Sequence, residues 1–148
     1  MADVNFYHLT RSTLKQTLPK LLEKIVASGK RGLVVASDQK RAEEINEELW
    51  SSTRKFLPHG SKEDGFATEQ PIYITYEADN PNSANILIMM GDAEHTGIND
   101  FEKSLILFDG NNPAQVATSR QRWKKLQEAG HTLIYWQQDE RGKWFEGN

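Results

Sequence analysis

Short apolar runs alternate along this chain with stretches in which apolar residues recur at every third or fourth position. An apolar run bounded by polar or turn residues predicts a buried strand, and the wider spacing predicts a helix with one buried face. Turn residues, above all Gly, Asn, Asp and Pro, separate most of these segments. The runs that predict strands are residues 4–9, 32–36, 72–76, 84–90, 105–108 and 132–138.

The first helical pattern runs from Leu14 to Val26 and ends before Gly29. Pro19 lies within it, and a proline inside a helix removes a hydrogen bond and crowds the preceding turn. Two alternatives follow. The helix is kinked, or it begins near Leu18 with Pro19 at its first position.

Two further helices are predicted. One has a buried stripe at Ala42, Ile45 and Leu49, and Ser37 or Asp38 can cap its start. The other begins with Asn112 as cap and Pro113 at the first helical position, since proline fits that position without losing a hydrogen bond. It runs to about Ala129 and stops at Gly130.

Strands that alternate with helices predict an α/β protein. We expect an α/β sandwich with a largely parallel central sheet. Residues 141–142 can turn the last run into a hairpin with residues 143–145, which makes the sheet mixed. Residues 51–70 read as one long loop. The length of 148 residues predicts a single domain over residues 1–148.

Composition narrows the class of protein. The chain has no cysteine, which excludes disulfides and thiolate metal ligands and is typical of the cytoplasm. No apolar stretch approaches the length that spans a bilayer, so we expect no membrane contact. The net charge of -3 argues against a general polyanion binder.

The motifs of common catalytic and cofactor sites are missing. No Gly-rich dinucleotide fingerprint, phosphate-binding loop or nucleophile elbow occurs. Asp92, Glu94 and His95 are the only local cluster of hard metal ligands, and a polar surface loop explains them better. His8 on the first strand is best explained as a hydrogen-bonded core or edge residue, and Asp109 as part of a turn. We therefore predict no catalytic residues, no metal and no cofactor.

The last predicted helix carries the strongest candidate binding surface. Residues 110–127 have a charge of +4 and no acid, which leaves -7 on the remainder. Val116, Arg120, Trp123 and Lys124 share one helix face, which suits an acidic peptide that carries an apolar residue. Arg122 and Lys125 point elsewhere but add to the positive field of this surface. The alternative is that Trp123 packs inward and the cations only solubilise the helix.

A second candidate surface is aromatic. Residues 56–60 read Phe-Leu-Pro-His-Gly and follow Trp50 in a polar stretch. Such a loop is either pinned to the core or presented to a partner, and physical reasoning alone favours pinning.

Six segments together resemble the chi subunit of bacterial DNA polymerase III holoenzyme, and they occur in order over essentially the whole chain. The combination of Leu-Trp, a Phe-x-Pro-His loop and Arg-x-Arg-aromatic-Lys before Ala-Gly is specific. The segments are Asn-Phe-Tyr-His-Leu at 5–9, Gly-Lys-Arg-Gly-Leu-Val at 29–34, Glu-Leu-Trp at 48–50, residues 56–60, Arg-Gln-Arg-Trp-Lys at 120–124 and Ala-Gly-His at 129–131.

The resemblance implies a three-layer α/β/α, Rossmann-like fold with a mixed, largely parallel central sheet. It also implies a non-catalytic adaptor in the clamp-loader assembly, monomeric in itself. It implies binding to the acidic C-terminal tail of single-stranded-DNA-binding protein, through Arg120, Trp123 and Lys124. A further family lysine falls at or beside Val116, which is not basic, so that contact is missing or replaced. The protein would then contact nucleic acid only indirectly, through its protein partner.

The resemblance also implies a psi-binding surface at Trp50 and Phe56, with Leu57 and Pro58 beside them, wherever a psi subunit exists. The aromatic loop is then presented to a partner. Two rival functions are direct binding of single-stranded nucleic acid and, with less support, a nucleotide-binding enzyme.

Overall fold

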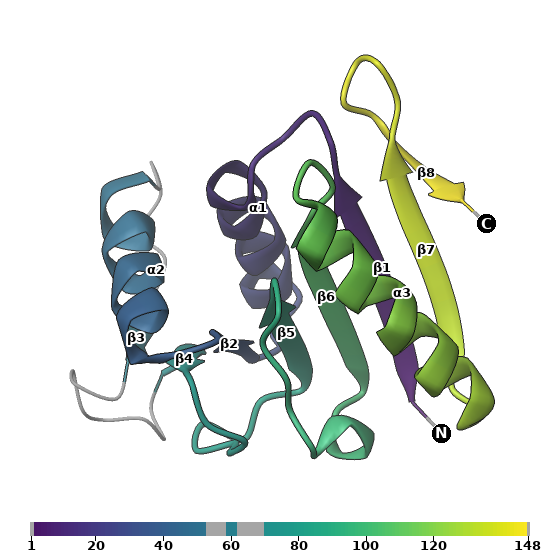
Figure 1. The fold of residues 1–148 in the computed structure, drawn as a ribbon. Coiled ribbons are helices and arrows are strands. Elements are labelled where there is room, and N and C mark those ends of the chain that lie inside the picture. The colour runs from purple at the N-terminus through teal and green to yellow at the C-terminus, as the bar shows by residue number, and fades with distance from the viewer. Residues whose placement is uncertain (1, 53–58, 62–69, 148) are drawn as a thin grey trace.

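The structure is a computed structural model that describes residues 2–52, 59–61 and 70–147. In these residues eight strands form one sheet in the order β3-β4-β2-β5-β6-β1-β7-β8 (Figure 1). Every neighbouring pair is parallel except β7 and β8, so the predicted mixed, largely parallel sheet is confirmed. The strands are β1 Asp3–Leu9, β2 Gly32–Val35, β3 His59–Ser61, β4 Ile72–Thr75, β5 Ile86–Met90, β6 Lys103–Asp109, β7 Thr132–Gln138 and β8 Trp144–Gly147.

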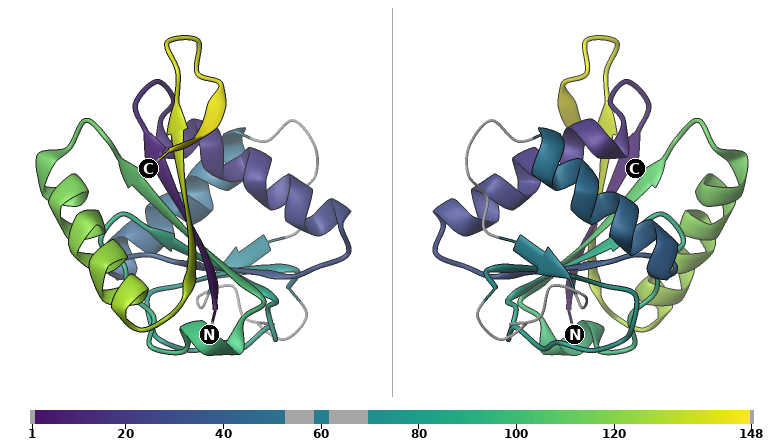
Figure 2. Two further views of the ribbon diagram at one scale, coloured as in Figure 1. Left: turned by 90° about the vertical axis from the view of Figure 1, so that its right-hand side faces the viewer. Right: turned by 90° about the vertical axis from the view of Figure 1, so that its left-hand side faces the viewer.

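Helices cover both faces of the sheet, which confirms the three-layer arrangement. The helices α1 (Leu14–Ala27) and α2 (Gln39–Ser52) lie on one face, and α3 (Pro113–Glu128) lies on the other (Figure 2). A short 3-10 helix, η3 (Ile98–Asp100), precedes β6. The apolar side chains divide accordingly into two buried clusters, one under α1 and α2 and one under α3. Strands buried on both faces explain why β2 and β5 read as continuous apolar runs.

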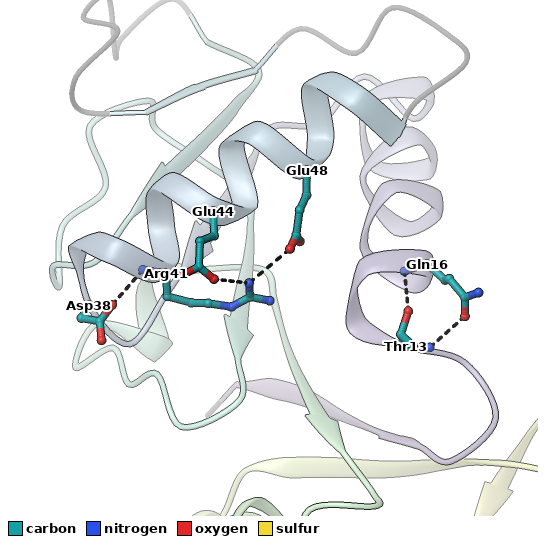
Figure 3. A network of polar contacts seen from close by, with 6 residues as sticks. All are labelled: Thr13, Gln16, Asp38, Arg41, Glu44 and Glu48. Atoms are coloured by element: carbon teal, nitrogen blue, oxygen red, sulfur yellow. Dashed lines mark hydrogen bonds and ion pairs between the residues drawn. The ribbon is translucent and has the colours of Figure 1, made fainter.

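The helix starts follow from their cap residues (Figure 3). The hydroxyl of Thr13 accepts the backbone N–H of Gln16, and the side chain of Gln16 accepts the N–H of Thr13 in return. This capping box begins α1 at Leu14 and leaves Pro19 inside the helix, so a start near Leu18 is wrong. Asp38 caps α2 by accepting the backbone N–H of Arg41 at 2.8 Å.

The loop expected over residues 51–70 contains regular structure. Helix α2 reaches Ser52, and β3 pairs in parallel with β4, so a continuous loop over residues 51–70 is wrong. Such a three-residue edge strand has too few residues for its period to be recognised in the sequence. The short helix η3 lies in the connection between β5 and β6. The closing hairpin is confirmed, with Trp136 opposite Glu146.

Gln138 at the end of β7 attaches this hairpin to the start of α1. Its side-chain oxygen accepts the backbone N–H groups of Thr10, Arg11 and Ser12 at 3.0–3.1 Å. Its side-chain nitrogen donates to the Ser12 hydroxyl and to the Gly142 carbonyl. Gln138 is buried, so no water can easily replace these bonds.

We predict that Gln138→Leu lowers the free energy of unfolding by about 2 kcal/mol or more, because three amide donors lose their acceptor. Urea unfolding of the variant and the parent measures the difference. Gln127→Leu on the exposed surface of α3 is the matched control, and we expect a change within about 0.5 kcal/mol. Equal effects of the two substitutions would contradict this role of Gln138.

Candidate functional site

A surface hollow of about 330 Å³ opens where α3 crosses the carboxyl ends of β1 and β7. In the register of the sheet, His8 on β1 lies opposite Gln137 on β7, so both side chains reach the face that α3 covers. The lining residues are His8, Arg120, Trp123, Tyr135 and Gln137.

Trp123 forms the floor of this hollow. Its indole is half-buried and meets Phe6 edge-on, with ring centroids 5.2 Å apart. Tyr135 meets the same indole at 5.6 Å with an interplanar angle of 80°. Edge-to-face packing of this kind fixes the ring positions. The sequence left open whether Trp123 packs inward or forms a binding surface. The indole does both, since it packs on the core and also faces the hollow.

His8 forms one wall. Its Nδ1 lies 2.6 Å from the Tyr135 hydroxyl, and its ring lies 4.9 Å from that of Phe108. Gly110 packs so tightly on the imidazole that a Cβ at this position would overlap the ring, which explains the glycine. The expected role of His8 as a hydrogen-bonded residue is confirmed, and the imidazole also faces the hollow.

The hollow favours uncharged forms of its titratable groups and negatively charged ligands. Burial lowers the pKa of His8 below 6.5, and the charge of Arg120 lowers it further, against a hydrogen bond to Gly110. Burial raises the pKa of Tyr135, which Arg120 partly opposes. Arg120 is exposed at the rim. The site thus combines neutral aromatic walls with one accessible guanidinium.

The other two predicted residues of this surface lie beside the hollow rather than in its lining. Lys124 is exposed, one residue after Trp123. Val116 is half-buried and packs on the cluster under α3. The hollow thus contains Arg120 and Trp123, with Lys124 beside it at the surface and Val116 one turn before Arg120 as an apolar contact with the core.

Arg122 has a structural role. Its guanidinium donates to the carbonyls of Gly91, Asp92 and Ala93 in the loop after β5, at 3.2 Å and 2.7 Å for the first two. Its side chain is 11% exposed, and burial lowers its pKa. It therefore anchors α3 to the sheet, and it does not contribute a free charge to the surface.

The predicted psi-binding residues fall largely outside the structure. Phe56, Leu57 and Pro58 lie outside the described residues, and Trp50 lies in the last turn of α2 with its side chain not described. The predicted position of the aromatic loop, presented or pinned, therefore stays a prediction.

The described ranges hold neither a metal-binding cluster nor a membrane-spanning helix. Among these residues no three His, Asp or Glu side chains gather into a metal-binding group. Near the candidate cluster, His95 contacts the Asp79 carbonyl through Nε2 at 2.7 Å, and Glu94 lies 3.8 Å from Arg122. No helix in the described residues is long and apolar enough to cross a membrane.

Sequence reasoning missed three of the five lining residues: His8, Tyr135 and Gln137. Their alternation on β1 and β7 was visible, but the sheet order was not. Nothing in the sequence indicates that the first strand lies beside a strand more than 120 residues away.

These features define an α/β protein with a cationic, aromatic-lined surface hollow at the edge of a helix. Comparison with known proteins gives the family. The family model described as DNA polymerase III chi subunit, HolC, matches residues 1–134. The chain belongs to this family, whose members are accessory subunits of the polymerase.

One curated relative is the probable DNA polymerase III subunit chi of Rickettsia prowazekii (strain Madrid E). It is 35% identical over 95 residues, which cover 64% of this chain. The aligned part spans 58% of the relative's own length.

The environment of His8 leads to a titration prediction. Because the folded chain favours neutral imidazole, the unfolded chain binds the proton more readily. The stabilisation from neutral His8 is complete above pH 6.5 and is lost as pH falls toward the folded-state pKa. An NMR titration of the ring proton of His8 should give a midpoint below 6.5. Arg120→Gln should raise this midpoint, whereas Lys125→Gln should not. A midpoint of 6.5 or higher in the unsubstituted protein would contradict the described environment.

Proposed function

We propose that this protein is a non-catalytic adaptor whose α3 hollow binds the acidic C-terminal tail of single-stranded-DNA-binding protein. The observation that carries the proposal is the accessible Arg120 guanidinium beside a hollow floored by Trp123 and walled by Tyr135. Membership of the chi family supports the same assignment.

The residues around the hollow suit the terminal carboxylate, the preceding acidic residues and the last side chain of such a tail. A planar guanidinium can hold a carboxylate through two parallel hydrogen bonds, which makes Arg120 the natural partner of the terminal carboxylate. Lys124, beside the hollow on the same helix, supplies a second positive charge for the preceding acids. The aromatic floor then receives the last side chain of the tail, and an apolar side chain fits it best.

The expected affinity is modest. Each charge-assisted hydrogen bond contributes about 1.5–3 kcal/mol net, and ordering of a flexible tail offsets part of the gain. A dissociation constant in the micromolar range, corresponding to about -8 kcal/mol, follows. A partner that presents several tails would raise the effective concentration and hold the polymerase assembly near single-stranded template.

We predict that Arg120→Ala weakens binding of the tail peptide about tenfold or more, because one charge-assisted hydrogen-bonding partner is lost. Isothermal titration of the full chain with the tail peptide from its own species measures this. Lys125→Ala removes the same charge from an exposed position on the same helix and should change the affinity far less.

A second peptide tests recognition of the chain end. A C-terminally amidated tail peptide should bind the parent more weakly, and it should bind the Arg120→Ala protein nearly as well as the free acid does. If Arg120→Ala leaves the affinity of the free acid unchanged, the proposed carboxylate clamp is wrong.

We further propose that the end of α2 and the loop after it bind a psi subunit. The proposal rests on the sequence Glu-Leu-Trp at 48–50 and on Phe56, Leu57 and Pro58, together with family membership. Aromatic anchors of this kind dominate many protein interfaces.

Phe56→Ala should leave the thermal unfolding of the isolated protein essentially unchanged and abolish capture of psi. Co-purification of the two subunits from their own species is the measurement. Retained psi in the Phe56→Ala sample would contradict the assignment, and Phe145→Ala, an exposed aromatic on β8, is the matched control.

A further inference from the structure

A second aromatic hollow, of about 390 Å³, lies on the sheet face opposite α3, between α1 and the β7–β8 hairpin. Three rings line it. Tyr7 and Trp136 are nearly parallel, with an interplanar angle of 17° and ring centroids 6.5 Å apart. Trp144 meets Tyr7 edge-on at 5.3 Å. All three side chains are half-buried and border the hollow, and Tyr7 and Trp144 also pack on the core cluster under α1 and α2.

The register of the sheet explains why these rings gather. Tyr7 pairs with Trp136 across the parallel strands β1 and β7, and Trp144 lies opposite Gln138 across the antiparallel hairpin. Alternation along the strands places all three on one face. Helix α1 packs on β2 and β6, and the hairpin extends beyond it at the edge of the sheet (Figures 1 and 2). The aromatic face of the hairpin is therefore bordered, rather than covered, by α1.

Two lysines form the helical wall of this hollow. Lys20 and Lys24 are exposed and one turn apart on α1. Within the described part of the chain, neither has an ion-pair partner. Glu146 lies on the same face of β8, opposite Trp136, but it does not line the hollow. The charge that faces a ligand in the hollow is therefore positive.

A neighbouring hollow of about 340 Å³ extends this positive surface, and Ser12 lines both. It lies between the loop after β1 and the loop after β6, where the chain leaves two adjacent strands in opposite directions. Such a crevice is the usual ligand position in parallel α/β sheets. Arg11 and Lys15 line it, with Asp109 as the only acid among the lining residues. Arg41, which also lines it, is paired with Glu44 and Glu48 (Figure 3).

We propose that these two hollows form one track that binds single-stranded nucleic acid. Bases stack on the rings of Tyr7, Trp136 and Trp144, and the backbone phosphates follow Lys20, Lys24 and the cations beyond Ser12. Proteins that bind single strands without sequence preference combine aromatic platforms with a cationic groove in this way. Lysines on flexible stems suit a row of phosphates, whereas the guanidinium beside the α3 hollow suits a carboxylate.

This track is separate from the proposed tail site. Its aromatic hollow lies on the opposite face of the sheet, and the neighbouring hollow shares no lining residue with the tail site, so both surfaces can be occupied at the same time. Trp136 and Trp144 follow residue 134, the last residue that the family model matches, so membership of the family does not supply these two indoles. Because the chain has a net charge of -3, we expect binding to be weak and visible mainly at low salt.

The test is fluorescence anisotropy of a labelled thymidine oligonucleotide of about 15 nucleotides, titrated with the full chain from about 50 mM salt upward. Lys20→Gln combined with Lys24→Gln should weaken binding about tenfold at the lowest salt. The slope of log affinity against log salt should become shallower by about 1.4, since each neutralised phosphate of a single strand contributes about 0.7. Trp144→Ala should weaken binding about fivefold or more, the loss expected for one stacked base.

The matched control is Lys103→Gln combined with Lys125→Gln, which removes the same charge from exposed positions away from the track. We expect it to retain most of the affinity. Tail-peptide binding by the Lys20 and Lys24 variant should be normal, which shows that the variant is folded and separates this test from that of the tail site.

Three results would overturn the proposal. The first is that the oligonucleotide fails to bind at about 50 mM salt. The second is that the control pair loses as much affinity as the Lys20 and Lys24 pair. The third is that polyglutamate, at an equal concentration of charge, displaces the oligonucleotide, which would assign the track to an acidic peptide.

Discussion

The parallel pairing of β1 with both β6 and β7 is the constraint on which both surface hollows depend. Strand β1 lies between β6, which precedes α3 in the sequence, and β7, which follows α3. Its side chains alternate between the two faces of the sheet. His8 therefore reaches the α3 side and Tyr7 the α1 side. A slip of one residue in this pairing would exchange the two faces and dismantle both hollows together.

Each hollow joins an aromatic wall from the sheet to cations from a helix, but the cations differ. In the hollow beside α3 the lining cation is Arg120, whose charge also lowers the pKa values of His8 and Tyr135. On the α1 side they are Lys20 and Lys24, which have flexible stems and no ion-pair partner among the described residues. A planar fork favours one carboxylate in a defined position, whereas point charges along a helix favour a repeating anion. The chemistry of the two surfaces is thus distinct, although their ingredients are similar.

Local signals predicted most of the fold, because hydrophobic period and cap residues act over a few positions. Asn112 and Pro113 located the start of α3, and the apolar runs located most strands. The start of α1 was left open, because Pro19 suggested a later beginning than the Thr13 capping box allows. The order of strands was beyond reach, since it depends on contacts between distant segments.

The site was predicted only in part, for the same reason. Its helical residues share a local period, but its strand residues meet only through the sheet. Spacing placed Arg122 away from the binding face, but it was also expected to add to the positive field, because its three carbonyl acceptors could not be foreseen.

The carboxamide of Gln138 links the end of β7 to the loop after β1 through hydrogen bonds. Three successive amides, those of Thr10, Arg11 and Ser12, share that one acceptor. They can exchange their hydrogens with solvent only when β7 releases its last residue or when the loop after β1 opens. The protection of these amides therefore reports on the fraying of a hairpin that lies more than 120 residues further along the chain. Opening of the loop after β1 and fraying of the end of β7 are therefore coupled through this one side chain.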